Sequence, residues 1–388
     1  MCANELMANF LVLINGWYSK NLVTGGEYHM LRVLKNWSLQ HKISLLTPKL
    51  SYQATKEMLP DVDLFYFSSA KDDEEIKSLL KLTISYITRI IRSVFVRPKE
   101  RPDLIITASH FLYDVLPAVM QRRRYKSKLV VYNHGVLEPY GSDNAGLRGN
   151  LMLLYEKLGL FLCKRSADII FAINSETKEF LIRKGFEPNR ITIMRNGVEH
   201  ELINSVKVNA KEYEASFCAR LVKRKGVYDL LDIWEKVLKY FPESRLVIMG
   251  QGEEFDSLQG AITRKQLDKN ILLTGYVPEI EKIAFLKSSK IFIYPSYWEP
   301  WGITLTEAMA CRLPVVCYNL STYDFVNDGI IKLNIGDRDQ MSSTIVDLLC
   351  NDTKRMKLGS TAEEASKKLN WDDISKEELN AVSALLNK

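Results

Sequence analysis

Residues 296–316 read SYWEPWGITLTEAMACRLPVV and place two tryptophans, two glutamates and a glycine between apolar runs. An apolar strand precedes them, so Glu299 falls in the loop at the carboxyl end of that strand. Thr304 and Glu307 fit a T-x-x-E capping box, and this structural interpretation makes Glu307 a helix-start residue. In the functional interpretation, Gly302 and the amides after it face a phosphate, Glu307 accepts hydrogen bonds from a ribose, and Glu299 binds a sugar.

The chain on either side alternates short apolar strands with helical segments, twice over. The first half contains the expected strands FLVLING, KISLLTP, VDLFYF, PDLIITAS, KLVVYNHG, ADIIFAINS and RITIMRNGV. After a polar connector at 203–214, the second half contains EASFCARL, SRLVIMGQG, NILLTGYV, KIFIYPS and PVVCYNL. This alternation predicts an α/β protein with two Rossmann-like domains facing each other across a cleft, and ligands at the carboxyl ends of the strands.

Composition limits the class of protein. The 388 residues suffice for two domains, and 46% hydrophobic with 26% charged residues is typical of a soluble globular protein. Six cysteines occur without a CxxC pair, which argues for reduced thiols rather than disulfides or a zinc site. The apolar run from Phe10 to Ile14 is too short for a secretory signal, and no window is long and apolar enough to span a membrane. We therefore expect an intracellular protein.

Two basic segments stand out against a formal net charge of +6. Residues 76–99 contain six Lys and Arg, no acid, and apolar residues at a helical period, while residues 122–128 read RRRYKSK. No nucleic-acid-reading motif accompanies them, so nucleic acid is not expected as a partner. The preferred interpretation is a core helix with a solvated basic face, and the alternative is that both segments bind an anionic membrane surface.

A cationic pair follows the strand EASFCARL. Arg220 ends this strand and Lys225 precedes Gly226, where a helix is expected to start. Two cations beside a helix N-terminus suit an anion such as a diphosphate. A solvated basic turn explains the same residues without a ligand.

These motifs together carry a family resemblance. YWEPWGITLTEAMACRLPVV resembles the E-x7-E signature of the retaining glycosyltransferases of family 4, whose fold is GT-B. The agreement continues in order over nearly the whole chain, through NLVTGGEYHMLRVL, YNHGVLE, ITIMRNGVEHEL, FCARLVKRKG, MGQGEEFDSL, LLTGYVPEIE and LNWDDIS. It implies an acceptor-binding domain at 1–203, a nucleotide-sugar-binding domain at 204–370 and a C-terminal helix at 371–388 that packs back on the first domain.

The resemblance also implies roles for individual residues. The implied catalytic set is Glu299 on the transferred sugar, His134 near the reaction centre, and Arg220 with Lys225 on the leaving diphosphate. The implied donor-binding set is Gly25, Gly26, Val277, Gly302, Ile303, Thr304 and Glu307. Within that set Val277 would meet the base through its backbone, and Glu307 would bind the ribose.

The implied activity is retaining transfer of a sugar from a UDP- or GDP-linked donor to a glycan or lipid-linked acceptor, through a short-lived oxocarbenium–phosphate ion pair. No cofactor and no bound metal are expected, because the two cations stabilise the leaving group. The expected location is the cytoplasm, with peripheral docking on the inner face of the membrane if the basic segments bind lipid. The alternatives are a non-catalytic sugar-nucleotide-binding protein and a sugar-nucleotide epimerase or phosphorylase on the same fold.

Two positions depart from the family pattern. Arg312 stands where the family usually has glycine at a helix end, a position that often needs positive φ. The loop NLSTYD at 319–324 replaces paired glycines. The hydroxyls of Ser321 and Thr322 are candidates to substitute for them, with Asp324 as the acid found later in that loop.

The remaining candidate ligands are interpreted structurally. Asp61 and Asp63 form a D-x-D pair, which we interpret as a solvated strand entry rather than a metal site. The other histidines lack ligand spacing: His29, His41, His110 and His200. His110 is kept as an acceptor-side candidate because it closes a strand.

Overall fold

The computed structural model describes residues 7–16, 25–48, 52–67, 76, 78–137 and 146–387. The chain divides into two compact units. Unit 1 comprises Met1–Asn196 with Trp371–Lys388, and unit 2 comprises Gly197–Asn370. The expected boundary after residue 203 lies inside α7 (His200–Ser205), a helix that belongs to unit 2.

The described part of unit 1 contains a parallel sheet of seven strands in the order β3-β2-β1-β4-β5-β6-β7. The strands are β1 (Asn9–Leu13), β2 (Lys42–Pro48), β3 (Asp63–Phe67), β4 (Leu104–Thr107), β5 (Lys128–Asn133), β6 (Ile169–Ala172) and β7 (Ile191–Ile193). Each coincides with one of the apolar runs that predicted a strand, because a parallel strand covered on both faces must be apolar throughout.

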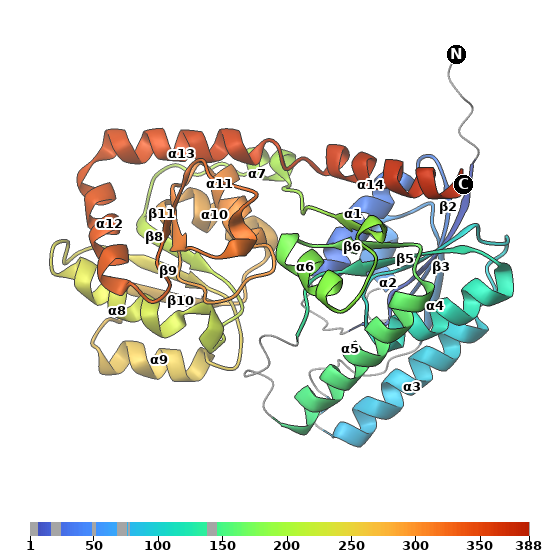
Figure 1. The fold of residues 1–388 in the computed structure, drawn as a ribbon. Helices are drawn as coiled ribbons and strands as arrows, with labels where there is room; N and C mark the ends of the chain where they lie inside the picture. Colours follow the sequence, from blue (N-terminus) through green and yellow to red (C-terminus); the bar gives the residue numbers. More distant parts are fainter. Residues whose placement is uncertain are drawn as a thin grey trace, which may run out of the picture. The chain divides into compact units, whose positions relative to one another are not determined.

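Helices cover both faces of this sheet (Figure 1). They are α1 (Gly25–Trp37), α2 (Tyr52–Met58), α3 (Leu79–Phe95), α4 (Leu112–Tyr125), α5 (Leu147–Ser166), α6 (Ser175–Arg183), the 3-10 turn η3 (Pro188–Arg190) and α14 (Trp371–Leu386). Neighbouring residues of β1 point to opposite faces. Phe10 contacts Trp37 of α1, with ring centroids 5.8 Å apart, whereas Leu11 packs with residues of α4, α5 and α6.

The C-terminal helix α14 packs on α1 within unit 1. Trp37 Nε1 donates a hydrogen bond to the Ser375 carbonyl at 2.8 Å. Tyr132 of β5 donates to Glu378 of α14 at 2.7 Å. The last helix is therefore fixed to unit 1 by buried polar contacts as well as by apolar packing.

Unit 2 contains a second parallel sheet, whose six described strands follow the order β10-β9-β8-β11-β12-β13. They are β8 (Tyr213–Cys218), β9 (Leu246–Met249), β10 (Ile271–Gly275), β11 (Ser289–Tyr294), β12 (Val315–Tyr318) and β13 (Ile330–Leu333). The edge strand β13 is the one that the sequence did not predict; its run IIKL includes a lysine, whereas the other four-residue strands have none.

Alternating helices cover the second sheet on its two faces, with α8 and α9 on one side and α10 and α11 on the other (Figure 1). The helical elements are η4 (Lys223–Lys225), α8 (Val227–Leu238), α9 (Phe255–Arg264), α10 (Glu279–Lys287), α11 (Ile303–Ala310), η5 (Ser321–Tyr323), α12 (Arg338–Cys350) and α13 (Asp352–Ser366). The elements from η4 to η5 each lie between one strand and the next, as the alternating pattern requires, and α12 and α13 follow the last strand.

Arg312 takes the left-handed backbone conformation, with φ of 63°. Its N–H donates to Met309 O at 2.9 Å and the Leu313 N–H donates to Ala308 O at 3.1 Å, which is the Schellman pattern. The expected positive φ is confirmed. The Arg312 guanidinium also donates to Ser360 Oγ of α13 at 2.7 Å, so this residue has gained a contact that glycine could not make.

Among the described residues, no helix combines the length and apolar character needed to cross a bilayer. The described cysteines, which exclude Cys2, carry free thiols.

Candidate functional site

The strand order of unit 2 reverses direction between β8 and β11. These two strands are parallel neighbours, and β9 lies on the other side of β8 while β12 lies on the other side of β11. Such a switch point, at the carboxyl ends of the strands, is where open parallel sheets bind ligands. The loops that leave β8 and β11 there carry the residues expected to act on the donor.

Gly226 allows these two loops to touch. Its φ is 68°, and a Cβ at this position would stand 1.9 Å from the Pro295 carbonyl oxygen. Any larger residue would therefore separate the loops. The Tyr297 N–H also donates to the Arg224 carbonyl at 2.8 Å, which ties the loop after β11 to the turn η4.

Lys225 and Glu299 form an ion pair at this junction. Lys225 Nζ also donates to the Trp298 carbonyl at 3.2 Å, and Tyr294 Oη donates to Glu299 Oε2 at 2.6 Å. The Lys225 and Glu299 side chains are only 9% and 13% exposed. The structure thus brings together two of the residues expected to be catalytic and adds Tyr294, whose strand-end position in KIFIYPS was its only sequence signal.

Burial by itself would raise the pKa of Glu299, but the Lys225 ammonium and hydrogen bonds from Lys225, Tyr294 and the Trp301 backbone hold that pKa below its usual value. Burial, followed by the charge of Glu299, raises the pKa of Tyr294 well above its usual range. At neutral pH Glu299 is therefore a carboxylate and Tyr294 a hydroxyl. This arrangement can accept hydrogen bonds from a ligand or stabilise a cation, but Glu299 has no proton to donate.

The helix α11 begins at Ile303, with Gly302 as the N-cap residue at φ of 89°. No side chain caps this helix, so the predicted T-x-x-E capping box of Thr304 and Glu307 does not form and that prediction is wrong. Thr304 lies inside the first turn, and its Oγ1 donates to the Cys218 carbonyl at the end of β8, at 2.8 Å. Because the first N–H groups of a helix have no intrahelical acceptor, the amides from Ile303 onward suit an anion.

Glu307 forms an ion pair with Lys282 of α10 at 2.7 Å. Burial raises the pKa of Glu307. The charge of Lys282 lowers this pKa, and the charge of Glu279 raises it further, so that the pKa stays above its usual value. Burial alone would lower the pKa of Lys282, but Glu307 and Glu279 raise it above its usual value. The sequence did not indicate Lys282, because its partner is contributed by another helix. Val277 lies in the loop that leads into α10, partly exposed.

Arg220 is not part of the Lys225–Glu299 pair. Its guanidinium lies 3.8 Å from Glu253, and both side chains are more than half exposed. An exposed pair of this kind is weak, so Arg220 can exchange Glu253 for an incoming anion at little cost. The expected cationic pair therefore consists of one buried member, Lys225, and one exposed member.

The loop 319–324 presents two buried side-chain hydroxyls, and the Tyr323 ring lies beside Gly302. A Cβ on Gly302 would stand 3.2 Å from Tyr323 Cε1. Tyr323 is fully buried, and Thr322 is 5% exposed. Among the described residues, neither Tyr323 Oη nor Thr322 Oγ1 has a hydrogen-bond partner. Such groups are costly unless a ligand or water pairs with them. The sequence suggested Thr322 but missed Tyr323.

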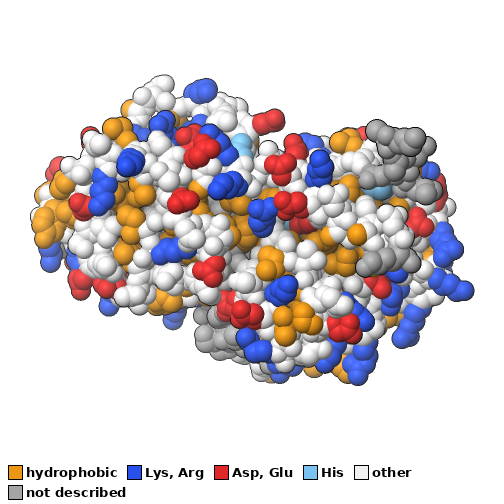
Figure 2. All heavy atoms as spheres, turned by 45° about the horizontal axis from the view of Figure 1, so that its top comes forward, with side chains coloured by type: hydrophobic (Ala, Val, Ile, Leu, Met, Phe, Trp, Pro, Cys, Tyr) orange, Lys and Arg blue, Asp and Glu red, His pale blue; other side chains and the backbone are white. Residues whose placement is uncertain are grey.

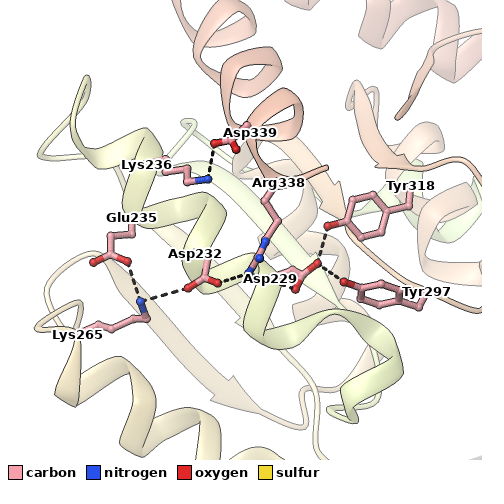
Figure 3. Close-up of polar contacts among 9 residues, drawn as sticks. All are labelled: Asp229, Asp232, Glu235, Lys236, Lys265, Tyr297, Tyr318, Arg338 and Asp339. Atoms are coloured by element: carbon pink, nitrogen blue, oxygen red, sulfur yellow. Dashed lines mark hydrogen bonds and ion pairs between the residues drawn. The ribbon is translucent and has the colours of Figure 1, made fainter. Parts of the chain in front are cut away.

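Asp229 of α8 supports the loop that carries Glu299 (Figure 3). Its Oδ2 accepts hydrogen bonds from Tyr297 and Tyr318, each at 2.6 Å. Burial and Asp229 raise the pKa of Tyr297 to about 12, so its hydroxyl stays protonated. Arg338 of α12 lies 4.0 Å from Asp229 and pairs with Asp232 at 2.5 Å. The sequence did not indicate Asp229.

In unit 1, His134 follows β5 and packs against Gly26. A Cβ on Gly26 would stand 2.6 Å from His134 Cδ2, so only glycine allows this contact. Gly25 and Gly26 form the first turn of α1. Burial lowers the pKa of His134, and His29 and His110 lower it further. Because its pKa is lowered, the His134 imidazole is neutral at pH 7. Its Nε2 has no hydrogen-bond partner among the described residues, so this atom can form a hydrogen bond with a ligand.

Two further histidines of unit 1 pair with buried carboxylates. His29 lies 3.0 Å from Glu378, which raises the His29 pKa against the lowering effect of burial. His110 lies 3.1 Å from Glu156, and both are almost fully buried. His200, in unit 2, lies 3.1 Å from the Ser366 carbonyl. These contacts suit structural roles, and His110 remains an acceptor-side candidate.

Three cations of the basic segments make contacts within unit 1, and one of them is buried. Arg89 is 1% exposed and donates to the Gly16 carbonyl at 2.8 Å. Arg122 pairs with Asp168 at 3.1 Å. Lys99 pairs with Asp63 at 2.7 Å, which accounts for one carboxylate of the D-x-D pair. Within the described ranges, no three His, Cys, Asp or Glu side chains gather as metal ligands.

Comparison with family models matches two descriptions along the chain. Residues 23–202 match the model of "Glycosyltransferase Family 4", and residues 198–365 match "Glycosyl transferases group 1". Among relatives, an uncharacterized glycosyltransferase of Methanocaldococcus jannaschii is 27% identical over 74% of this chain and 76% of its own length. A poly(glycerol-phosphate) alpha-glucosyltransferase of Bacillus subtilis is 22% identical over 94% of this chain but only 50% of its own length.

Solved structures of similar fold span nearly the whole chain. Anabaena HepE, crystallised with UDP and glucose, superposes with a TM-score of 0.74 at 17% identity, covering 97% of this chain and 100% of that protein. Sucrose-phosphate synthase from Thermosynechococcus elongatus gives a TM-score of 0.74 at 15% identity, with 98% and 99% covered. With its two parallel Rossmann-like sheets, the chain therefore has the GT-B fold.

Proposed function

The chain belongs to the family 4 glycosyltransferases, and from that premise we propose that it transfers a hexose with retention from a UDP- or GDP-sugar to a glycan or lipid-linked acceptor, without a bound metal. The observation that carries this proposal is the buried Lys225–Glu299 pair, held by Tyr294 at the switch point of unit 2. A cation there stabilises a leaving diphosphate, and a fixed carboxylate faces the positive charge that develops on the sugar.

Each neighbouring group has a defined part in the proposed reaction. The amides from Gly302 to Thr304 bind the diphosphate at the start of α11. Glu307, oriented by Lys282, accepts ribose hydroxyls, and Val277 meets the base through its backbone. Arg220 leaves Glu253 to bind the outer phosphate. In unit 1, neutral His134 hydrogen-bonds the transferred sugar, and Gly25 and Gly26 present backbone amides.

Retention is supported by the names of two relatives. One is a poly(glycerol-phosphate) alpha-glucosyltransferase and another, from Staphylococcus aureus, is a poly(ribitol-phosphate) alpha-N-acetylglucosaminyltransferase. An alpha product formed from an α-linked nucleotide sugar keeps its configuration. Glu299 cannot act as a general acid while ionised, which fits a mechanism in which the departing phosphate accepts the acceptor proton.

The acceptor is proposed to be membrane-linked, and the enzyme to work in the cytoplasm on the inner face of the membrane. Support comes from relatives such as the alpha-monoglucosyldiacylglycerol synthase of Acholeplasma laidlawii, 26% identical over 43% of this chain. The exposed basic residues within 76–99 and 122–128 favour an anionic surface.

Donor screening followed by product analysis tests the proposal. A UDP- or GDP-sugar at 100 times its dissociation constant should stabilise the protein by about 2.7 kcal/mol in thermal unfolding. The stabilising donor should then be hydrolysed or transferred in excess chelator, and NMR of the product should show the donor's anomeric configuration. Tight donor binding without turnover would instead support a non-catalytic sugar-nucleotide-binding protein, and conversion of the nucleotide-linked sugar to an epimer would support an epimerase.

A further inference from the structure

Two neighbouring helices of unit 1 expose rows of large apolar side chains. We call these residues the apolar ridge: Leu80, Ile84, Ile87, Ile91 and Phe95 of α3, with Leu147, Leu154, Leu158 and Phe161 of α5. Leu80 is 70% exposed, Phe95 66% and Leu147 76%. The spacing of three or four residues places each row on one face of its helix.

The apolar ridge is not the core-facing side of these helices. The opposite face of α3 carries Leu82 and Tyr86, which are buried, and Arg89, which binds the Asn15 and Gly16 carbonyls. Tyr86 contacts Tyr155 of α5, with ring centroids 5.8 Å apart. Both helices pack against α4, and Figure 1 shows the three together at the edge of unit 1. Both helices already have a buried face, so folding does not require the ridge.

The exposed charges that α3 and α5 themselves carry all have one sign. The helix α3 contains no Asp or Glu, and the single acid of α5, Glu156, is fully buried against His110. Lys81 and Arg92 lie on the same flank of α3, about three turns apart, and both are exposed. At the other end, Arg124 donates to the Val94 carbonyl at 2.6 Å, which places the basic end of α4 beside the end of α3. Figure 2 shows Lys and Arg side chains gathered on the outer edge of unit 1.

We propose that the apolar ridge inserts into the surface of an anionic lipid bilayer, with the surrounding Lys and Arg side chains at the level of the headgroups. An apolar face bordered by cations is the pattern of helices that lie in a membrane interface. A row this large exceeds the scattered apolar residues of an ordinary monomer surface. A second copy of this chain is the less suitable occupant, because a two-fold contact through α3 and α5 would bring their Lys and Arg side chains together, and neither helix exposes an Asp or Glu to face them.

This inference deepens the proposed use of a membrane-linked acceptor, and it differs from purely electrostatic docking. Exposed charges are screened by salt, whereas insertion of apolar side chains is not. Wild-type protein should therefore bind anionic vesicles most tightly at low salt and still retain part of that binding at high salt.

Vesicle co-sedimentation tests insertion of the apolar ridge by measuring binding alone, without a glycosyl-transfer assay. A negative result would therefore contradict this inference without bearing on the proposed reaction. The probe is vesicles of equal parts phosphatidylcholine and phosphatidylglycerol. The ridge variant replaces Ile84, Ile87 and Ile91 with Ser. The matched control replaces three exposed apolar residues of unit 1 outside the ridge with Ser: Leu39, Ile182 and Ile193. The ridge variant should lose at least about tenfold in partitioning, and the control should bind as wild type does.

Unchanged vesicle binding by the ridge variant overturns the proposal. So does a concentration-dependent dimer in analytical ultracentrifugation that the ridge variant abolishes, because the ridge would then be an interface between copies. Melting temperatures equal to or above wild type are expected for the ridge variant, since these side chains are exposed. Replacing Lys81 and Arg92 with Glu should remove only the salt-sensitive part of the binding.

Discussion

Lys225 and Glu299, 74 positions apart in the chain, form a buried ion pair at the carboxyl ends of two neighbouring strands of unit 2. The contact exists because Gly226 lets the turn after β8 approach the Pro295 carbonyl. The pair keeps Glu299 ionised in a site where burial would otherwise favour its neutral form.

The first prediction concerns removal of the cation. Lys225→Ala should reduce turnover about 100-fold, because a preorganised charge on the leaving group is lost. It should also reduce the free energy of unfolding by about 3 kcal/mol at pH 7, since an unpaired carboxylate is left buried. The matched control is Lys223→Ala, an exposed residue in the same turn, which should change neither quantity.

The same variant has a pH signature. In wild type the Glu299 pKa lies below its unfolded value, so its stabilising contribution is present above the unfolded pKa and is lost as pH falls through the folded one. Without Lys225, burial should raise that pKa, and the carboxyl should protonate instead of remaining an unpaired charge. The difference in free energy of unfolding between wild type and Lys225→Ala, measured by urea unfolding, should therefore become smaller as the pH falls from 7 to 4. A difference that stays constant with pH would show that Lys225 does not control the ionisation of Glu299.

The second prediction concerns Asp229, which holds the loop of Glu299 through Tyr297. Asp229→Asn replaces an acceptor of two hydroxyls by an amide and should lower kcat/KM about tenfold by loosening that loop. Asp232→Asn, which alters the Arg338 contact in the same network, should leave kcat/KM near the wild-type value. Steady-state kinetics compares the two, and equal losses would show that Asp229 has only a general structural role.

The third prediction separates binding from chemistry. Glu307→Gln should raise the KM for the donor about tenfold with little change in kcat, because a ribose contact is the same in ground and transition states. Glu281→Gln, an exposed carboxylate of α10, serves as the control. A loss confined to kcat would place Glu307 at the reaction centre instead.

The fourth prediction concerns the left-handed residue after α11. Arg312→Ala keeps the positive φ but loses the contact with Ser360, whereas Arg312→Gly loses the same contact and relieves the backbone strain. Arg312→Gly should therefore be more stable than Arg312→Ala by about 1 kcal/mol in chemical unfolding. Equal stability of the two variants would mean that the strain is absorbed elsewhere.

The fifth prediction concerns the buried hydroxyl of Tyr323. Tyr323→Phe removes a group without a partner among the described residues, so the melting temperature should stay the same or rise. The donor KM should rise severalfold, because that hydroxyl would pair with the bound donor. Tyr318→Phe is the contrasting variant: its hydroxyl bonds to Asp229, and its removal should lower the melting temperature. An unchanged donor KM in Tyr323→Phe would show that the Tyr323 hydroxyl does not contact the donor and pairs instead with a buried water.

The sequence was sufficient for every described strand except β13, and for the C-terminal end of α11. A strand covered on both faces must be apolar along its whole length, so runs such as KLVVYNHG identified β5 without knowledge of its neighbours. The positive φ of Arg312 was also predictable, because Arg312 stands at a helix end where the resembled family usually has glycine, and such positions often need positive φ. Order along the chain likewise placed Lys225 and Glu299 at strand ends.

Only the tertiary structure decided which side chains meet. Thr304 and Glu307 fit a capping box by spacing, but Thr304 bonds to the end of β8 and Glu307 to Lys282, because packing brings those partners closer than the local backbone. Arg89 was counted with an exposed basic segment and is instead buried, while Ile84, Ile87 and Ile91 are exposed. A helical period shows that a face is apolar but not which of two apolar faces the sheet will cover, since that depends on residues distant in sequence.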